Sequence, residues 1–81
     1  MKIDVQLFAA ACELAGKSTV SVEIPEGATV ADLRSQLVEQ TPNLRSLADI
    51  LFVAVNNQYA GESQVITLND TISSFPPVSG G

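Results

Sequence analysis

The chain has 81 residues, of which 46% are hydrophobic and 16% are charged, a composition that fits one globular domain and excludes a disordered chain. Nine acidic and four basic residues give a net charge of −5, which argues against nucleic acid and anionic membranes as partners and favours a partner with a basic face. Because no apolar run approaches the ~18–20 residues of a membrane span and Lys2-Ile3-Asp4 does not begin a signal or transit peptide, we expect a cytoplasmic domain.

Two segments at the start of the chain predict a pair of strands. Hydrophobic and polar residues alternate over residues 1–7, as in a half-buried strand, and Phe8 then falls on the polar face. Residues 9–16 predict a short helical turn that closes at Gly16, and residues 18–24 alternate again. We predict that the two strands form an antiparallel hairpin with a long connection.

The next segment predicts the main helix. Pro25-Glu26-Gly27 indicates a turn, and Thr29 and Asp32 have the spacing of a capping box, in which each side chain reaches the backbone amide of the other. Pro42 ends the helix, because the residue before a proline is disfavoured in the helical conformation. Apolar residues recur at helical spacing over about three turns. This stripe consists of Val30, Leu33, Leu37 and Val38.

The second half of the chain predicts short strands. Residues 43–50 are predicted to be a connection that contains a helical turn. Residues 51–55 are an almost continuous apolar run, which favours a central strand covered on both faces. We expect one or two short strands within residues 59–68, a turn at Asn69-Asp70 and a final strand over residues 71–78.

The predicted elements indicate an α+β fold. Two strands, one main helix and further strands place a single helix on one face of a mixed sheet. This order is that of the ubiquitin-like β-grasp roll, although ferredoxin-like and other small α+β folds would also permit it. We assign the domain to residues 1–78 and expect residues 79–81 to form a flexible tail.

Residues that carry catalysis are scarce in this chain. It has no histidine, which is the usual acid–base group at neutral pH and the commonest metal ligand. Its single cysteine, Cys12, can form neither an internal disulfide nor a Cys/His pair, and it fits a reducing compartment. We interpret Cys12 as a small, half-buried hydrophobic residue. We therefore predict no metal or cofactor site and no catalysis by the chain alone.

The last seven residues, Phe75-Pro76-Pro77-Val78-Ser79-Gly80-Gly81, resemble the closing segment of the MoaD-type small subunits of molybdopterin synthase, in the MoaD/ThiS ubiquitin-like family. The resemblance extends to the first strand and loop, the helix entry and the apolar strand. These matches are Leu7-Phe8-Ala9 with Glu13-Leu14-Ala15-Gly16, Ala28-Thr29-Val30 with Leu33, and Val53-Ala54-Val55-Asn56. The family often has an arginine where this chain has Cys12, and commonly Gly-Asp-Glu where it has Asn69-Asp70-Thr71.

The resemblance implies that the chain carries sulfur on its own C-terminus. In this family a partner enzyme adenylates the terminal carboxylate with ATP, and sulfur replaces AMP to leave a thiocarboxylate. That sulfur attacks the cyclic pyranopterin precursor inside the large synthase subunit. The reacting group would be the Gly81 carboxylate, with Ser79 and Gly80 as the rest of the tail. No cofactor is expected on the chain, because the activating enzyme uses the ATP.

The chemistry of the tail agrees with this implication. Glycine has no Cβ, so Gly80-Gly81 can pass through a narrow channel. Pro76-Pro77 lacks backbone donors and favours an extended exit from the domain. We expect Phe8 and Phe75 to lie near each other on the sheet face away from the helix, where a partner would cover them. The predicted partner interface comprises Phe8, Tyr59, Phe75, Pro76 and Pro77, with packing in its own loop as the alternative for Tyr59.

The implied partners are an E1-like adenylyltransferase, a sulfur donor protein and the large synthase subunit, the last in a heterotetramer of two small and two large subunits. Two alternatives share the fold and the Gly80-Gly81 end. One is the sulfur carrier of the thiamine pathway, which is typically shorter and lacks the Pro-Pro-Val approach. The other is a ubiquitin-like modifier that is conjugated through Gly81 to lysines of other proteins.

Overall fold

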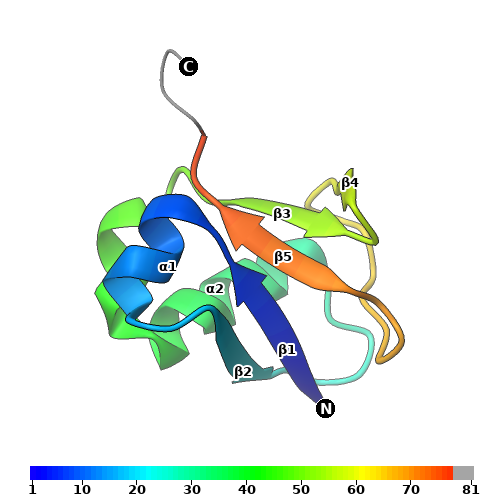
Figure 1. The fold of residues 1–81 in the computed structure, drawn as a ribbon. Helices are drawn as coiled ribbons and strands as arrows, with labels where there is room; N and C mark the ends of the chain where they lie inside the picture. The colour runs from blue at the N-terminus through cyan, green and yellow to red at the C-terminus, as the bar shows by residue number, and fades with distance from the viewer. Residues whose placement is uncertain (78–81) are drawn as a thin grey trace.

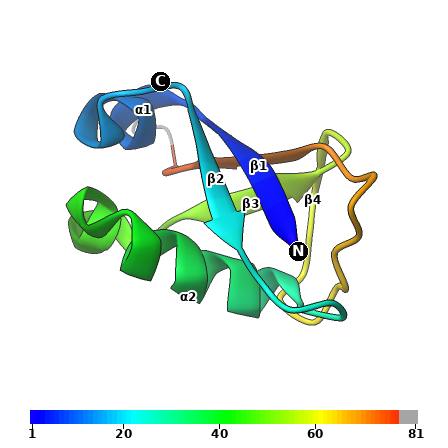
Figure 2. The same ribbon diagram turned by 90° about the horizontal axis from the view of Figure 1, so that it is seen from below.

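The computed structural model describes residues 1–77, so the predicted flexible tail at residues 79–81 lies outside the described part of the chain. A five-stranded sheet forms one layer, and helix α2 lies along one of its faces (Figure 1). In chain order the elements are β1 (Lys2–Leu7), α1 (Ala9–Ala15), β2 (Thr19–Glu23), α2 (Val30–Gln40), the 3₁₀ helix η1 (Pro42–Leu47), β3 (Phe52–Val55), β4 (Gln58–Tyr59) and β5 (Ile72–Phe75). Viewed at right angles, the sheet and α2 are clearly separate layers (Figure 2).

The first two strands form the predicted antiparallel pair. Lys2 lies opposite Glu23 and Gln6 opposite Thr19, and alternate residues of both strands are buried. The connection between them contains α1, which ends at Gly16 as predicted. Gly16 has a φ of 77°, in the left-handed region that glycine adopts without strain, and its amide donates to the Cys12 carbonyl at 3.0 Å.

Helix α2 begins at the predicted capping box. The Asp32 amide donates to Thr29 Oγ1 at 3.3 Å, and the Thr29 amide donates to Asp32 Oδ2 at 3.0 Å. The helix ends at Gln40, two residues before Pro42, and the chain continues as η1. The predicted apolar stripe faces the sheet. Its residues Val30, Leu33 and Leu37 are buried, and Val38 packs against the core at its edge.

The sheet order corrects one prediction. The strands are arranged β2-β1-β5-β3-β4, with β1 and β5 parallel and the other pairs antiparallel. The central strand is therefore β5, and the prediction of a central, doubly covered strand at residues 51–55 is wrong. On one face of β3, Val53 and Val55 enter the core, but on the other face Phe52 is 43% exposed. The run is apolar on both faces because its outer face belongs to an aromatic cluster, described below.

Two other strands are shorter than predicted. Within residues 59–68 the only regular pairing is that of Tyr59 in β4, supplemented by an isolated bridge between Thr29 and Val65. β5 ends at Phe75, because Pro76 and Pro77 have no N–H to continue the ladder. The predicted turn before β5 is present, with the Asp70 amide donating to the Thr67 carbonyl at 3.1 Å.

This topology is the β-grasp roll. An antiparallel pair of strands packs over one helix, and the last strand inserts beside the first in parallel. In the described part of the chain, each helix falls short of the length and apolar character needed to cross a membrane.

A hydrogen-bonded network joins the turn after β3 to the turn before β5. The Asp70 carboxylate accepts from the Thr67 amide at 2.9 Å and from Asn56 Nδ2 at 3.0 Å. Asn56 Oδ1 in turn accepts from the Thr71 amide at 2.9 Å. Hydrogen bonds to a carboxylate favour its charged form, so the Thr67 amide first, and Asn56 second, lower the pKa of Asp70 below its usual value of 3.8.

Acid is expected to weaken this network measurably. Because the pKa of Asp70 is lower in the folded chain, its contribution to stability is complete above pH 3.8 and is lost as the pH falls through the lower, folded value. We expect Asp70→Asn to lose stability at neutral pH and to show a smaller further loss on acidification. Urea unfolding at about pH 7 and pH 3 measures both effects. Asp49→Asn, at an exposed position, is the control, and parallel pH curves for Asp70→Asn and the unaltered chain would contradict the assignment.

Candidate functional site

Three aromatic rings gather on the sheet face opposite α2. The strand register places Phe52 directly across from Phe75, and Tyr59 across from Ala54 on the same face. Ring centroids are 5.5 Å apart for Phe52 and Tyr59, 5.8 Å for Tyr59 and Phe75, and 6.2 Å for Phe52 and Phe75. These separations lie in the range of favourable aromatic pairs. We call Phe52, Tyr59 and Phe75 the aromatic cluster.

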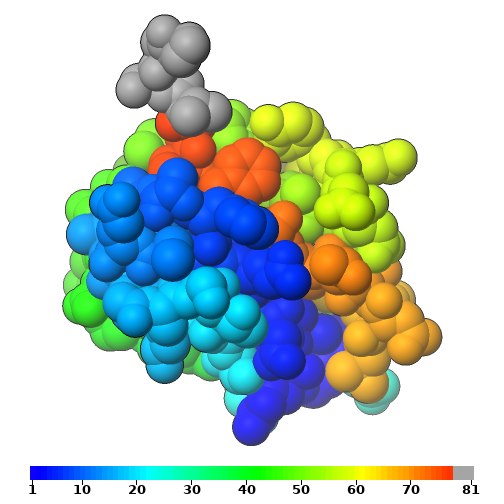
Figure 3. Space-filling view, viewed as in Figure 1, coloured from blue at the N-terminus to red at the C-terminus, as the bar shows by residue number. Residues whose placement is uncertain are grey.

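The aromatic cluster is open to solvent. Tyr59 is 73% exposed and Phe52 is 43% exposed, whereas Phe75 is half-buried between them. Large exposed apolar groups that touch one another mark interaction surfaces more strongly than single ones do. Figure 3 shows the end of β5, in orange-red, at the surface between the start of the chain in blue and the β3–β4 region in yellow-green.

The aromatic cluster lies where β5 ends and the chain continues toward its C-terminus. Phe75 is the last residue of β5, and the predicted interface residues Pro76 and Pro77 follow directly, the first buried and the second exposed. Burial of Pro76 anchors the point from which the chain continues. The predicted tail residues Ser79, Gly80 and Gly81 lie outside the described residues.

Phe8 stands beside the cluster but is not part of it. The Phe8 amide donates to the Ser74 carbonyl at 3.2 Å, so the backbone of Phe8 lies directly beside the end of β5. Its extended backbone (φ −127°, ψ 159°) continues the alternation of β1 and turns its side chain away from the core face that Leu7 occupies. Phe8 is 51% exposed. The structure thus agrees with the predicted position of Phe8 and Phe75, and their role in binding stays a prediction.

Phe52 is the member of the site that the sequence reading missed. Phe52 lies inside an apolar run, so its neighbours hide the alternation that singles out Phe8 directly after β1. The alternation of residues between the two faces of a strand nevertheless separates Phe52 from its neighbours. Leu51, Val53 and Val55 share one face and are buried, whereas Phe52 is on the opposite face.

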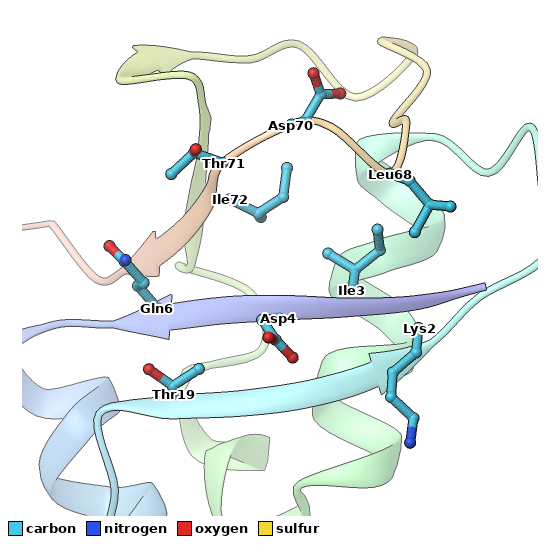
Figure 4. Close-up of a pocket in the computed structure, with 9 residues that line it drawn as sticks. All are labelled: Lys2, Ile3, Asp4, Gln6, Thr19, Leu68, Asp70, Thr71 and Ile72. Carbon is cyan, nitrogen blue, oxygen red and sulfur yellow. The ribbon is translucent and has the colours of Figure 1, made fainter.

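A shallow hollow of about 390 Å³ lies on the same sheet face, beside β1, and offers no catalytic grouping (Figure 4). Its carboxylates come from different elements and point away from each other. Asp4 accepts a hydrogen bond from the Ser21 hydroxyl at 2.7 Å, and Asp70 is held in the network already described. Among residues 1–77, no three His, Cys, Asp or Glu side chains are grouped as a metal site requires.

Cys12 has the environment predicted for it. It is partly buried, and its side chain packs against the hydrophobic core. Among residues 1–77, the aromatic cluster is therefore the feature that most resembles an interaction surface.

A β-grasp fold with this strand order defines a ubiquitin-like protein. The family model described as the ThiS family matches residues 5–81, and the chain belongs to this family. A molybdopterin synthase sulfur carrier subunit of Arabidopsis thaliana is 32% identical to it, over all of this chain and 84% of the relative.

A second kind of relative is a modifier. The small archaeal modifier protein 1 of Haloferax volcanii is 37% identical, over 94% of this chain and 97% of the relative. The crystal structure of that modifier superposes with a TM-score of 0.86 at 34% identity and covers all of both chains. Relatives across the full length of the chain therefore carry names of two different functions.

Proposed function

We propose that this chain is the sulfur carrier subunit of a molybdopterin synthase. The observation that carries the proposal is the match to relatives of that name over the whole chain. Two features of the C-terminal segment support it. In Phe75-Pro76-Pro77 the prolines restrict the backbone to an extended form, and Gly80-Gly81 has no side chains, which suits a segment that enters a partner's active site.

The reacting group in this proposal is the Gly81 carboxylate. One of its oxygens attacks the α-phosphorus of ATP on the activating enzyme, and pyrophosphate leaves. Sulfide supplied by the donor protein then attacks the acyl carbon and displaces AMP, which leaves a thiocarboxylate. That sulfur attacks a carbon of the cyclic pyranopterin precursor and displaces an oxygen from it, and hydrolysis of the new acyl–sulfur bond restores the carboxylate. Two such carriers supply the two sulfurs of the dithiolene.

The partners follow from the same chemistry. An E1-like adenylyltransferase binds the ATP, so this chain needs no cofactor of its own. The large synthase subunit binds the precursor and covers the aromatic cluster and Phe8, in a heterotetramer of two small and two large subunits. The scarcity of catalytic groups in residues 1–77 supports this division of labour, since the partners supply the acid–base residues.

A second candidate function is that of a protein modifier, and the identity to the Haloferax volcanii modifier favours it. Activation of Gly81 would be the same, but a lysine amine of a target protein would displace AMP and form an amide. A third, the sulfur carrier of a thiamine pathway, differs from the first only in the acceptor of the sulfur.

Intact mass spectrometry separates these functions. The chain is incubated with its activating enzyme, ATP and a sulfur source, and its mass is measured. We expect one sulfur-for-oxygen exchange on the chain, followed by molybdopterin formation when the large subunit and the pyranopterin precursor are added. A ladder of lysine conjugates without that exchange would support the modifier. Exchange without molybdopterin formation would support the thiamine carrier.

A further inference from the structure

One edge of the sheet carries backbone groups that the fold leaves free. β2 is an edge strand, paired with β1 on one side and with no strand of the described chain on the other. An edge strand presents a row of N–H and C=O groups that can template another strand. Because native proteins usually shield such groups, outward backbone groups of β2 that have no partner indicate a candidate binding edge.

The register identifies the outward groups. Met1 and Ile24 exchange both backbone hydrogen bonds, and the Leu7 amide donates to the Ser18 carbonyl at 2.8 Å. In an antiparallel pair, hydrogen-bonded and non-hydrogen-bonded residues alternate. The N–H and C=O groups of Thr19, Ser21 and Glu23 therefore point away from β1.

The last of these three residues already has a partner that imitates a strand. Gln40, the final residue of α2, places its side-chain amide against Glu23. The Glu23 amide donates to Gln40 Oε1 at 3.0 Å, and Gln40 Nε2 donates to the Glu23 carbonyl at 2.9 Å. This is the reciprocal pair that a neighbouring backbone would make. Between residues 1 and 77, the outward groups of Thr19 and Ser21 have no such partner.

A groove of about 490 Å³ runs beside these free groups. It separates the edge of β2 from the end of α2 and the start of η1. Its lining residues are Lys17, Thr19, Val20, Ser21, Gln40, Thr41, Pro42 and Asn43. Lys17 is the one charged side chain in this lining, in a chain of net charge −5. The groove therefore combines backbone donors and acceptors, the apolar ring of Pro42 and one positive charge.

We propose that the edge of β2 binds an extended peptide segment of a partner protein as an added strand, with an acidic residue of that segment beside Lys17. Backbone pairing to Thr19 and Ser21 holds the segment, and alternate side chains enter the groove against Pro42. Small apolar residues at alternate positions suit this role. The site is separate from the aromatic cluster on β3, β4 and β5, because β2 is at the opposite edge of the sheet.

A peptide fits this edge better than a second copy of the chain. Pairing of two β2 strands about a two-fold axis through Ser21 would place Glu23 of each copy opposite Thr19 of the other, where the Gln40 amide already occupies the Glu23 backbone. The two copies would also bring together equal charges of −5. A short acidic segment meets Lys17 and needs only the free stretch of the edge.

Titration with a synthetic peptide, followed by amide NMR, tests the proposal. The probe is a peptide of about eight residues, with alternating valine and threonine and an aspartate at each end so that either strand direction suits Lys17. We expect the amide signals of Thr19 and Ser21 to shift and to become protected from hydrogen exchange. A probe with N-methyl groups on the alternate amides facing β2 should bind about tenfold more weakly or worse. Equal binding of the two probes would overturn the proposal.

Matched variants of the chain sharpen the test. Ser21→Pro removes an outward N–H that β1 does not use, so the fold should persist while probe binding is lost. Ser21→Ala keeps that N–H, loses only the side-chain bond to Asp4 and should bind normally. Lys17→Gln should weaken binding about two- to fivefold. Folded Ser21→Pro that binds as well as Ser21→Ala would refute the site.

Two further measurements address the alternatives. Gln40→Ala frees the Glu23 backbone for the added strand and should tighten binding about threefold, and an unchanged affinity would contradict the assigned outward groups. Sedimentation of the chain alone detects a second copy on this edge. A concentration-dependent dimer that Ser21→Pro abolishes would replace the peptide with a second copy as the occupant.

Discussion

Adding one residue after Gly81 is expected to abolish thiocarboxylate formation while leaving the domain folded. Adenylation needs a free carboxylate on a residue that fits the activating enzyme's channel. An added residue moves the carboxylate further along the chain, and its side chain makes the terminal segment bulkier. The described core and sheet are formed within residues 1–77, so we expect the extended chain to fold. We expect the same urea unfolding curve as for the unaltered chain and no sulfur-for-oxygen exchange in its intact mass.

The control is the same residue added before Met1, which should leave loading unchanged. Gly81→Ala provides an intermediate case, because its methyl group narrows the fit without moving the carboxylate along the chain. We expect sulfur loading of Gly81→Ala to be slower, because the methyl group fits a narrow channel less well. We expect its stability to be unchanged. Full sulfur loading of the extended chain, with no trimming visible by mass, would contradict a role for the Gly81 carboxylate.

Truncation of the aromatic cluster is expected to weaken binding of the large synthase subunit by about 1–3 kcal/mol for Phe75→Ala, Phe52→Ala or Phe8→Ala, the loss typical of a residue central to an interface. Phe75 touches both other rings, so its removal also loosens Phe52 and Tyr59. Because Phe52 and Phe75 are in contact, their double variant should not show additive losses.

Calorimetry of the two subunits measures these affinities, and urea unfolding measures stability alongside. Leu68→Ala is the matched control for binding, since Leu68 is 64% exposed but lies in the turn before β5, outside the cluster. Leu37→Ala is the control for stability. Leu37 is fully buried, so its truncation should cost about 2–5 kcal/mol of unfolding free energy, more than any of the surface aromatics. Unchanged affinity in both Phe8→Ala and Phe75→Ala would remove this face from the interface.

These two predictions concern one region. β5 delivers the chain from the centre of the sheet to the aromatic cluster and, one residue later, to the proline exit. A partner that binds the aromatic cluster would therefore also contact the chain where it leaves β5. Pro76 and Pro77 would restrict the directions in which the following residues can extend. In the proposed function, this short connection would couple binding at the aromatic cluster to the delivery of Gly81.

Local features of this chain could be predicted from the sequence because their causes lie within a few residues. Alternation defined β1 and β2, the Thr29–Asp32 capping box defined the start of α2, and Gly16 and Pro42 ended the two helices. The proposed function also rests on local sequence, since the segment from Phe75 to Gly81 indicates it without any tertiary contact. The tail's own conformation lies outside the described residues.

The order of the strands was decided only by the tertiary structure. Which strand becomes central depends on long-range packing and pairing, and an apolar run such as residues 51–55 satisfies either position. Insertion of β5 between β1 and β3 brought Phe52 opposite Phe75 and left the outer face of β3 open to solvent. The free edge of β2 has the same origin. The pairing of Gln40 with Glu23 joins residues far apart in the chain, and no local pattern specifies such a contact.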